Sequence, residues 1–358
     1  MSNCLEVNLG DSVSIPMGNW FSEVDIIPLE TSNISLLNEI EKIEYFHNRY
    51  YIFDRRQQAV FVFDSTGKFV YNTLSYKGRG PGQYNMIMDI TINRITGNLE
   101  ILDAPARRML IYNKDGIFIR DFFLPQDLLP LGHFRSFSDD LYLFYSHDRD
   151  QDRECIFAYS ALAQKVIKKM FMTNGFEGYL VKTARDAFYW KETVLLFSHT
   201  YPNNDVYQID KNLEIEKLYS YDFGKHTFNI NALPKNESPS FYRSFDVHNK
   251  EKYVFPVLKF ETSEFYICFF LFNNSLFLSR HPKHLRTEHS KGEVISAKFK
   301  DGGAINPPIL FDNTYLYNVI EPSWISFFMN SLFSDKQKKL LESIKEDDNP
   351  LLFKYKFK

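Results

Sequence analysis

A glycine-rich segment at residues 76–84 (YKGRGPGQY) is the first place where residue types and spacing could support chemistry. Backbone N–H groups of glycine-rich loops bind phosphate when the glycines follow G-x-G-x-x-G or G-x-x-x-x-G-K-[ST]. Here the spacing is G-x-G-x-G, and a strand-like run at residues 88–92 stands where a phosphate site needs a helix N-terminus. We therefore interpret the segment as a connection with unusual backbone angles, anchored by Tyr84. A ligand contact by Arg79 or Tyr84 is the alternative.

Residues 148–154 place carboxylates at alternate positions, which would share one face of a strand: Asp148, Asp150, Asp152 and Glu154. Hard oxygen ligands of this kind suit a calcium ion. The EF-hand pattern, however, requires Gly where Arg153 stands and Glu where Tyr159 stands. A solvated hairpin loop with internal charge pairing is therefore the favoured interpretation.

Three histidines, His281, His284 and His289, follow an apolar run. Imidazoles three residues apart can share a metal ion on a helix, but Pro282 and the polar residues around it predict a loop. No G-x-S-x-G segment is present, so the nucleophile of α/β-hydrolases is not indicated. We expect no metal site, no cofactor and no identifiable catalytic residue.

The three cysteines, Cys4, Cys155 and Cys268, are too few and too scattered for a disulfide framework or a thiolate metal site. Cys268 lies in an apolar run, residues 265–272, that is far shorter than the roughly 18 residues needed to cross a bilayer. We expect it to be a buried small hydrophobic residue. Residues 1–4 lack the charged and apolar parts of a signal peptide, but Cys4 stands where a bacterial lipoprotein carries its lipid after the leader is removed. An incidental terminal cysteine is the alternative.

The composition favours a folded, strand-rich protein. Of 358 residues, 44% are apolar, enough for a sizeable core, and 17% are aromatic, with 35 Phe and 22 Tyr. Aromatic residues favour strands over helices. Because 42 Lys and Arg face 45 Asp and Glu, the chain as a whole has no electrostatic attraction to nucleic acid or to acidic membranes.

The elements that would position the candidate residues form a repeat. Residues 50–69 and 99–118 align at a shift of 49, which pairs Asp54 with Asp103 and Gly67 with Gly116. Each unit reads strand, short connection, strand, turn, strand. The turn begins with Asp or Asn and ends with Gly, the order of a type I turn closed by a left-handed glycine. A period near 50 indicates a propeller or another repeat array.

More divergent copies keep this spacing at residues 156–167, 206–219, 265–274 and 309–317, with Asn212 in place of the turn glycine in the second of them. Many strands are apolar at consecutive positions, which is typical of strands covered on both faces. Since few segments before residue 320 have helical periodicity, sheets stacked around an axis must provide that cover. We therefore predict an all-β fold, a six-bladed β-propeller at residues 1–320. Its first strand, at residues 4–9 or 24–29, is expected to complete the last blade.

Residues 321–358 are predicted to form a C-terminal helical extension and a final strand packed on the propeller. Ser334 and Gln337 form a capping-box pattern before Leu340 and Leu341, which share one helical face with Ile344. Alternation from residue 352 onward is typical of a strand.

Residues 64–122 resemble an NHL-type propeller repeat, with departures in the glycine spacing and at Tyr84, where Phe is more usual. Residues 78–84, taken with residues 346–350 (EDDNP), resemble more closely a six-bladed β-propeller family of gut and related bacteria, many of them lipoproteins. The resemblance implies six blades, export to the cell envelope and lipid attachment at Cys4. It transfers no catalytic residues, because the molecular function of that family is not established.

Loops from every blade of a propeller converge at the mouth of its channel, but the fold alone does not name a ligand. We expect ligand contacts from a glycine-rich loop and the repeated Asp and Arg positions beside it: Arg55, Arg79, Tyr84, Asp89 and Arg107. The predicted function is non-enzymatic binding of a protein, peptide or glycan in the cell envelope. The alternative is a lyase or hydrolase that acts on a glycan or peptide from a propeller scaffold.

We expect a monomer that binds no nucleic acid and touches a membrane only through a lipid on Cys4. A cytoplasmic location is the alternative if no leader precedes residue 1. A third interpretation, NHL-like RNA binding, predicts a steep salt dependence of affinity. Three pairs of adjacent basic residues offer local positive charge: Arg55 and Arg56, Arg107 and Arg108, Lys168 and Lys169.

Overall fold

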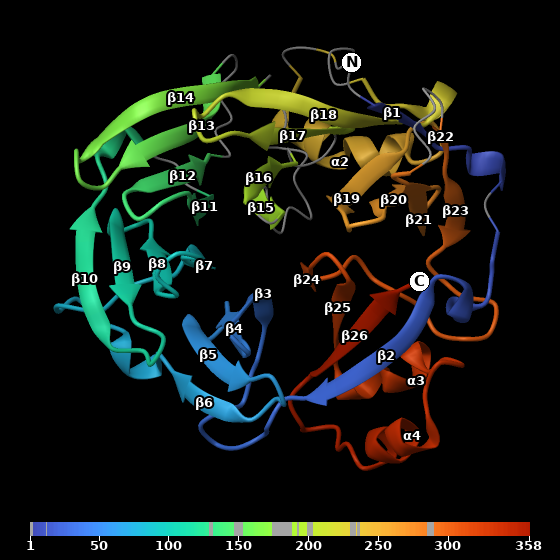
Figure 1. Cartoon of the computed structure of the whole chain (residues 1–358), viewed down its shortest axis with the longest axis horizontal. Coiled ribbons are helices and arrows are strands. Elements are labelled where there is room, and N and C mark those ends of the chain that lie inside the picture. The colour runs from blue at the N-terminus through green and yellow to red at the C-terminus, as the bar shows by residue number, and fades with distance from the viewer. Residues whose placement is uncertain are drawn as a thin grey trace.

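Six β-sheets stand around a central axis in the computed structural model of the chain, as Figure 1 shows. The structure describes residues 3–11, 13–128, 132–146, 153–173, 188–191, 193–198, 203–229, 234, 237–284 and 290–358. Five sheets have four strands and one has six. The predicted six-bladed β-propeller is therefore confirmed.

The first three blades follow the chain from the innermost strand outward. Blade 1 consists of β3 (Ile40–Phe46), β4 (Arg49–Asp54), β5 (Ala59–Asp64) and β6 (Phe69–Asn72). Blade 2 consists of β7 (Asp89–Ile92), β8 (Leu99–Asp103), β9 (Arg108–Tyr112) and β10 (Phe118–Phe123). Blade 3 consists of β11 (His133–Ser136), β12 (Leu141–Tyr145), β13 (Arg153–Ser160) and β14 (Lys165–Thr173).

The other three blades recruit strands from distant parts of the chain. Blade 4 consists of β15 (Phe188–Lys191), β16 (Val194–Phe197), β17 (Asp205–Ile209) and β18 (Ile215–Asp222), extended outward by β1 (Asn3–Glu6) and β22 (Ser290–Lys291). Blade 5 consists of β19 (Phe255–Glu261), β20 (Phe265–Phe272), β21 (Ser275–Pro282) and β23 (Glu293–Ser296). Blade 6 consists of β24 (Leu310–Phe311), β25 (Tyr315–Ile320), β26 (Leu351–Phe357) and β2 (Phe21–Pro28).

The two clearest sequence repeats are the second to fourth strands of blades 1 and 2. Their turns have the predicted conformation, since Gly67 and Gly116 adopt φ values of +87° and +79°. The side chains of Asp64 and Asn113 accept the backbone N–H two residues further on, at 2.8 and 2.9 Å. The turn chemistry therefore sets where the outermost strand of each blade begins.

One turn prediction was wrong by one residue. In blade 4 the left-handed residue is Leu213, with φ +62°, and not Asn212. The turn starts at Asp210, so its fourth position falls on Leu213, whose side chain is buried in the core between blades 3 and 4. In blade 5, Asn273 and Asn274 both have positive φ, at +47° and +59°, as a two-residue hairpin loop requires.

The propeller is closed by β2, the second of the two predicted possibilities. This strand runs antiparallel to β26, with Val24 opposite Tyr355, and forms the outer edge of blade 6. The first possibility, residues 4–9, was wrong: β1 lies parallel to β18 and β22 in blade 4. It is β2 that precedes blade 1 directly, so it can complete the last blade as the chain enters the first.

Three α-helices were resolved among the described residues: α2 (Pro239–Asn249), α3 (Ile325–Phe328) and α4 (Asp335–Glu342). Ser334 and Gln337 form the predicted capping box at α4. Helix α2 was not predicted, although Ser238 caps it and Pro239 occupies its first turn. No described helix is long and apolar enough to cross a membrane.

Short 3₁₀ turns accompany the connections: η1 (Leu9–Asp11), η2 (Met17–Asn19), η3 (Leu74–Tyr76), η4 (Gln126–Leu128), η5 (Gly224–His226) and η7 (Pro322–Trp324). Helices α3 and α4 lie in the chain between β25 and β26, two neighbouring strands of blade 6. The expected division at residue 320 therefore falls inside that blade.

The core consists of apolar clusters between neighbouring blades. Tyr50 and Ile52 of β4 pack with blade 6, whereas Tyr51 and Phe53 of the same strand pack with blade 2. The same division holds at the four other blade interfaces. This is the reason why the strands are apolar at consecutive positions: each face of a sheet meets a different neighbour.

Candidate functional site

An axial cavity lies where the innermost strands of the propeller meet. Its volume is about 70 Å³, and every blade contributes to its lining. Blade 1 contributes Glu41, Lys42, Ile43 and Glu44; blade 2 Arg94; blade 3 Arg135; blade 4 Phe188, Tyr189 and Trp190; blade 5 Leu258; and blade 6 Leu310 and Phe311 with Pro308 and Ile309 before them. The convergence of all six blades makes this cavity the candidate site.

A network of ion pairs builds the wall formed by blades 1 to 3. The Lys42 ammonium lies 2.7 Å from Asp89 Oδ1 and 3.5 Å from Glu44 Oε1. Arg135 lies 3.0 Å from the same oxygen of Glu44. Asp89 also accepts the backbone N–H of Phe134 at 3.0 Å. One carboxylate of blade 2 thus joins blades 1 and 3, and all the charges of this network are largely shielded from water.

The environment of Asp89 favours its ionised form. Burial alone would raise the pKa of Asp89, but Lys42, His133 and Arg135 together lower it well below the usual value. His133 Nδ1 lies 3.8 Å from Asp89 Oδ2, beyond hydrogen-bond distance. Because a carboxylate with a depressed pKa is a weak proton acceptor, this pair is poorly suited to general base catalysis.

Aromatic and aliphatic side chains build the opposite wall. Trp190 stacks on Phe137 with a centroid distance of 5.8 Å, and Tyr189 meets the ring of Phe311 edge to face at 5.2 Å. Phe188 is fully buried beside them. Because ring pairs of this kind restrict each other's orientation, the wall presents a defined apolar surface to the cavity.

Arg94, just after the end of β7, lines the cavity but forms no ion pair with a described residue. Its guanidinium has no ion pair or hydrogen bond to any described side chain, whereas Lys42 and Arg135 are each held by a carboxylate. Burial lowers the pKa of Arg94 despite the nearby charge of Glu44, which raises it. Arg94 is therefore the one cation of the lining that forms no ion pair with a described residue.

A second polar cluster lies behind the aromatic wall, between blades 4 and 5. The buried carboxylate of Glu261 is held between Lys191, at 2.9 Å, and Lys283, at 2.6 Å. Deeper in this interface the Lys259 ammonium donates to the carbonyl of Asn203. Burial lowers the pKa of Lys259 to about 8.

Of the five predicted ligand contacts, the structure brings only Asp89 to the ion-pair network beside the cavity. Tyr84 is fully buried, and its hydroxyl lies 2.6 Å from Thr73 Oγ1 and donates to the Thr73 carbonyl at 3.0 Å. Tyr84 therefore anchors the glycine-rich connection, as the structural interpretation of that segment requires. The loop's own backbone is also occupied, since Gly78 N–H donates to the Tyr84 carbonyl at 2.9 Å.

The three predicted arginines lie outside the cavity lining. Arg55 is exposed and paired with Glu39 and Glu41 on the rim. Arg79 is exposed on the glycine-rich loop. Arg107 adopts φ +51° in the turn between β8 and β9, where its backbone carbonyl accepts the N–H of Leu124 at 2.8 Å.

The cavity residues that sequence reasoning missed come mainly from innermost strands. Lys42 and Glu44 lie in β3 and Arg135 in β11, before the strands that carry the visible repeat. A signal for β3 was available, because the shift of 49 that aligns the two repeats also places residues 40–43 on 89–92, the β7 strand.

The comparison with known proteins identifies a family. The sequence model of a protein family described as Domain of unknown function (DUF4934) matches residues 3–356. The chain belongs to the DUF4934 family. This confirms the expected resemblance to a family of six-bladed propellers. No curated protein sequence matches the chain.

Solved structures share the fold of this DUF4934 protein. A Bacteroides fragilis protein described as exported has a TM-score of 0.79 at 18% identity, with 99% of each chain covered. A member of the DUF4221 family from Bacteroides vulgatus has a TM-score of 0.54 at 10% identity, covering 94% of this chain and 98% of that one. Virginiamycin B lyase from Staphylococcus aureus reaches only 0.40 at 13% identity, covering 76% and 72%, too distant to carry an argument.

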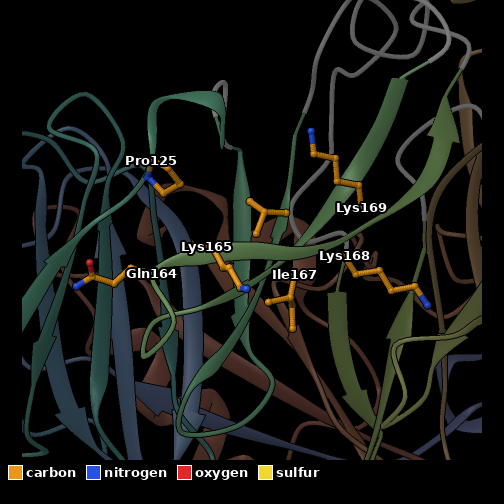
Figure 2. A pocket seen from close by; sticks show the side chains of 7 residues that line it. Pro125, Gln164, Lys165, Ile167, Lys168 and Lys169 are labelled. Carbon is orange, nitrogen blue, oxygen red and sulfur yellow. The ribbon is translucent and has the colours of Figure 1, made fainter.

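Two other concavities of the DUF4934 protein lie away from the axis. One, of about 350 Å³, follows β14, where Figure 2 shows Lys165, Lys168 and Lys169 spread along the strand rather than converging on a point. Another, of about 750 Å³, lies beside β1, where Asp222 is already engaged by Thr227 at 2.8 Å. Neither combines residues of several blades as the axial cavity does.

The predicted histidine and carboxylate clusters lie only partly within the described residues. His281 is buried, its Nε2 lies 2.9 Å from the Glu6 carbonyl, and His284 is exposed. His289 and residues 148–152 lie outside the described residues. In the described part of the chain no three His, Cys, Asp or Glu side chains are grouped to hold a metal ion.

None of the three cysteines forms a disulfide, and Cys268 is fully buried, as predicted. Cys4 lies within β1, opposite Ser220 of β18. Its side chain is half-buried, and burial raises the pKa of its thiol.

Proposed function

We propose that this protein is a non-enzymatic binding protein that takes its ligand at the axial cavity, at the mouth of the propeller channel. The observation that carries the proposal is the convergence of all six blades on one cavity with an aromatic wall and with the guanidinium of Arg94, which forms no ion pair with a described residue. Concave sites with an apolar lining and a few placed polar groups are typical of ligand recognition.

A lyase or hydrolase is less well supported by the same cavity. Proton transfer requires groups whose pKa lies near the working pH. The carboxylates of Glu44 and Asp89 are instead held in ion pairs, and the pKa of Asp89 is lowered far from neutrality by Lys42. The geometry is therefore better matched to binding than to acid–base catalysis.

The proposal is tested by filling the cavity. Leu258→Trp and, as a second variant, Leu310→Trp place an indole in the lining, whereas Ile34→Trp adds one at a position that is 62% exposed. A panel of small aromatic and aliphatic compounds is screened by ligand-observed NMR. We expect the compounds that bind the natural protein to be lost in both cavity variants and retained in Ile34→Trp.

Two results of this screen would overturn the proposal. One is equal binding by all four proteins. The other is an absence of any bound compound while the natural protein is folded. Thermal unfolding of each variant separates a blocked cavity from a failure to fold.

We also propose that the protein works in the cell envelope, held by a lipid on Cys4. The similar Bacteroides fragilis protein is described as exported, and Cys4 lies in β1, in the outer part of blade 4 between β18 and β22. The test is metabolic labelling of the native gene product with a palmitate analogue. Label should appear in the membrane fraction and disappear in Cys4→Ser, and an unlabelled natural protein would contradict the anchor.

A further inference from the structure

We infer that the axial cavity recognises its ligand by a single terminal carboxylate, whose apolar remainder lies against the aromatic wall. This inference rests on the proposed binding function and specifies the chemical class of the ligand.

The charged residues around the cavity favour a ligand with a single negative charge. Three cations, Lys42, Arg94 and Arg135, face three carboxylates, Glu41, Glu44 and Asp89. Lys42 and Arg135 form ion pairs with Glu44 and Asp89, and Glu41 is paired with Arg55 on the rim, so Arg94 is the cation of the lining that forms no ion pair with a described residue. A single cation without an ion pair matches a monoanion better than a dianion such as a phosphate monoester.

The geometry of the Arg94 guanidinium favours a carboxylate. Its planar fork of donors matches the two oxygens of a carboxylate, and such paired hydrogen bonds are among the stronger ones in proteins. Arg94 has no described partner that would compete for these donors. Arg135, by contrast, already uses its guanidinium on Glu44 and on the carbonyl of Phe134.

The size of the cavity limits which part of a ligand can enter it. A volume of about 70 Å³ has room for a handful of waters at roughly 10–15 Å³ each, and hence for a carboxylate but not for a sugar ring. The rest of the ligand must extend along the lining, where Phe188, Trp190 and Leu258 offer apolar surface. An end-on orientation follows, with the carboxylate at Arg94 and the apolar remainder along the aromatic wall.

The experiment compares matched charged and neutral compounds. A series of ω-phenylalkanoates of increasing chain length is titrated into the natural protein by calorimetry, beside the corresponding primary amides and ω-phenylalkyl phosphates. The variants are Arg94→Gln and, as a control, Arg79→Gln, which alters an exposed arginine outside the cavity lining.

We expect the carboxylates to bind about tenfold or more tightly than the amides, the scale of a charge-assisted hydrogen bond. Arg94→Gln should remove that preference and leave the affinity for amides unchanged, whereas Arg79→Gln should alter neither. An unchanged unfolding midpoint in Arg94→Gln shows that the loss is not a loss of fold.

Failure of the inference is distinguishable from failure of the proposed function. Equal binding of carboxylates and amides, or tighter binding of phosphates, would overturn the carboxylate while leaving the binding function in place. Retention of the carboxylate preference in Arg94→Gln would overturn the role of Arg94. An absence of binding by all three series would overturn both.

Discussion

The two walls of the axial cavity are built from different chemistry. Blades 1 to 3 face it with ionised groups, in which Lys42 and Arg135 share the carboxylates of Glu44 and Asp89. Blades 4 to 6 face it with the rings of Phe188, Trp190 and Phe311, and their own buried carboxylate, Glu261, lies behind those rings. The residues of both walls contact other blades, by ion pairs in the first wall and by ring packing in the second.

The two walls should therefore respond differently to the removal of a side chain. Removing one member of a buried ion pair leaves its partner charged and unpaired, which is costly. Removing a ring from a packed surface forfeits contacts but leaves no unpaired charge behind. The ionic wall should therefore be the more sensitive of the two, and its positions the more precisely fixed.

The largest expected effect comes from breaking the ionic wall. Asp89→Ala leaves the buried Lys42 ammonium without its closest partner and should lower the free energy of unfolding by about 3–5 kcal/mol. Urea denaturation measures this. The matched control is Asp115→Ala, which removes an ion pair with Arg49 at a half-exposed surface position and should cost less than about 1 kcal/mol.

A compensated variant sharpens that result. Replacing both partners, Lys42→Met with Asp89→Leu, removes the charges together and should recover much of the lost stability. Equal destabilisation by the single and the double replacement would mean that packing, and not the unpaired charge, decides the stability of this wall.

A smaller effect is expected behind the aromatic wall, from Lys259. Because its pKa in the folded protein is lowered from 10.5 to about 8, folding disfavours the ammonium. This penalty is complete below pH 8 and is relieved as the pH rises from 8 toward 10.5, so the contribution of Lys259 to stability should rise by about 2 kcal/mol between pH 8 and 10. The difference in unfolding free energy between the natural protein and Lys259→Met, measured across that range, tests the sign. A constant difference would contradict it.

The smallest effect is expected from the aromatic wall itself. Trp190 is only partly buried and stacks on a single ring, Phe137, so Trp190→Leu should cost about 1 kcal/mol. Denaturation at neutral pH measures it. A loss as large as that of Asp89→Ala would abolish the contrast between the two walls.

The blades were predictable because their turns and their packing leave local marks in the sequence. Asp64 with Gly67, and Asn113 with Gly116, fix the outer turns, and the consecutive apolar residues of β4 report that both faces of the strand are covered. Each of these signals arises within one blade. The propeller and its blade count follow from their repetition.

The site was much less predictable, because it depends on contacts between blades. Arg107 stands near Asp103 in the sequence, but its backbone is needed for a turn. Lys42 and Asp89, by contrast, meet only when blade 1 packs on blade 2. A single sequence does not show which of its charged residues meet across two blades, and of the five predicted ligand contacts only Asp89 lies in the ion-pair network beside the cavity.

Blade 6 closes late in synthesis, because it pairs two strands, β2 and β26, that lie far apart in the chain. β2 is made near the start of the chain, yet its partner β26 is made almost last. At about 5–20 residues per second, the interval lasts roughly half a minute. Throughout it β2 lacks β26, the strand with which it pairs, and Val24 lacks the core residues on which it packs. The nascent chain therefore carries an unpaired strand of the kind that is prone to aggregation.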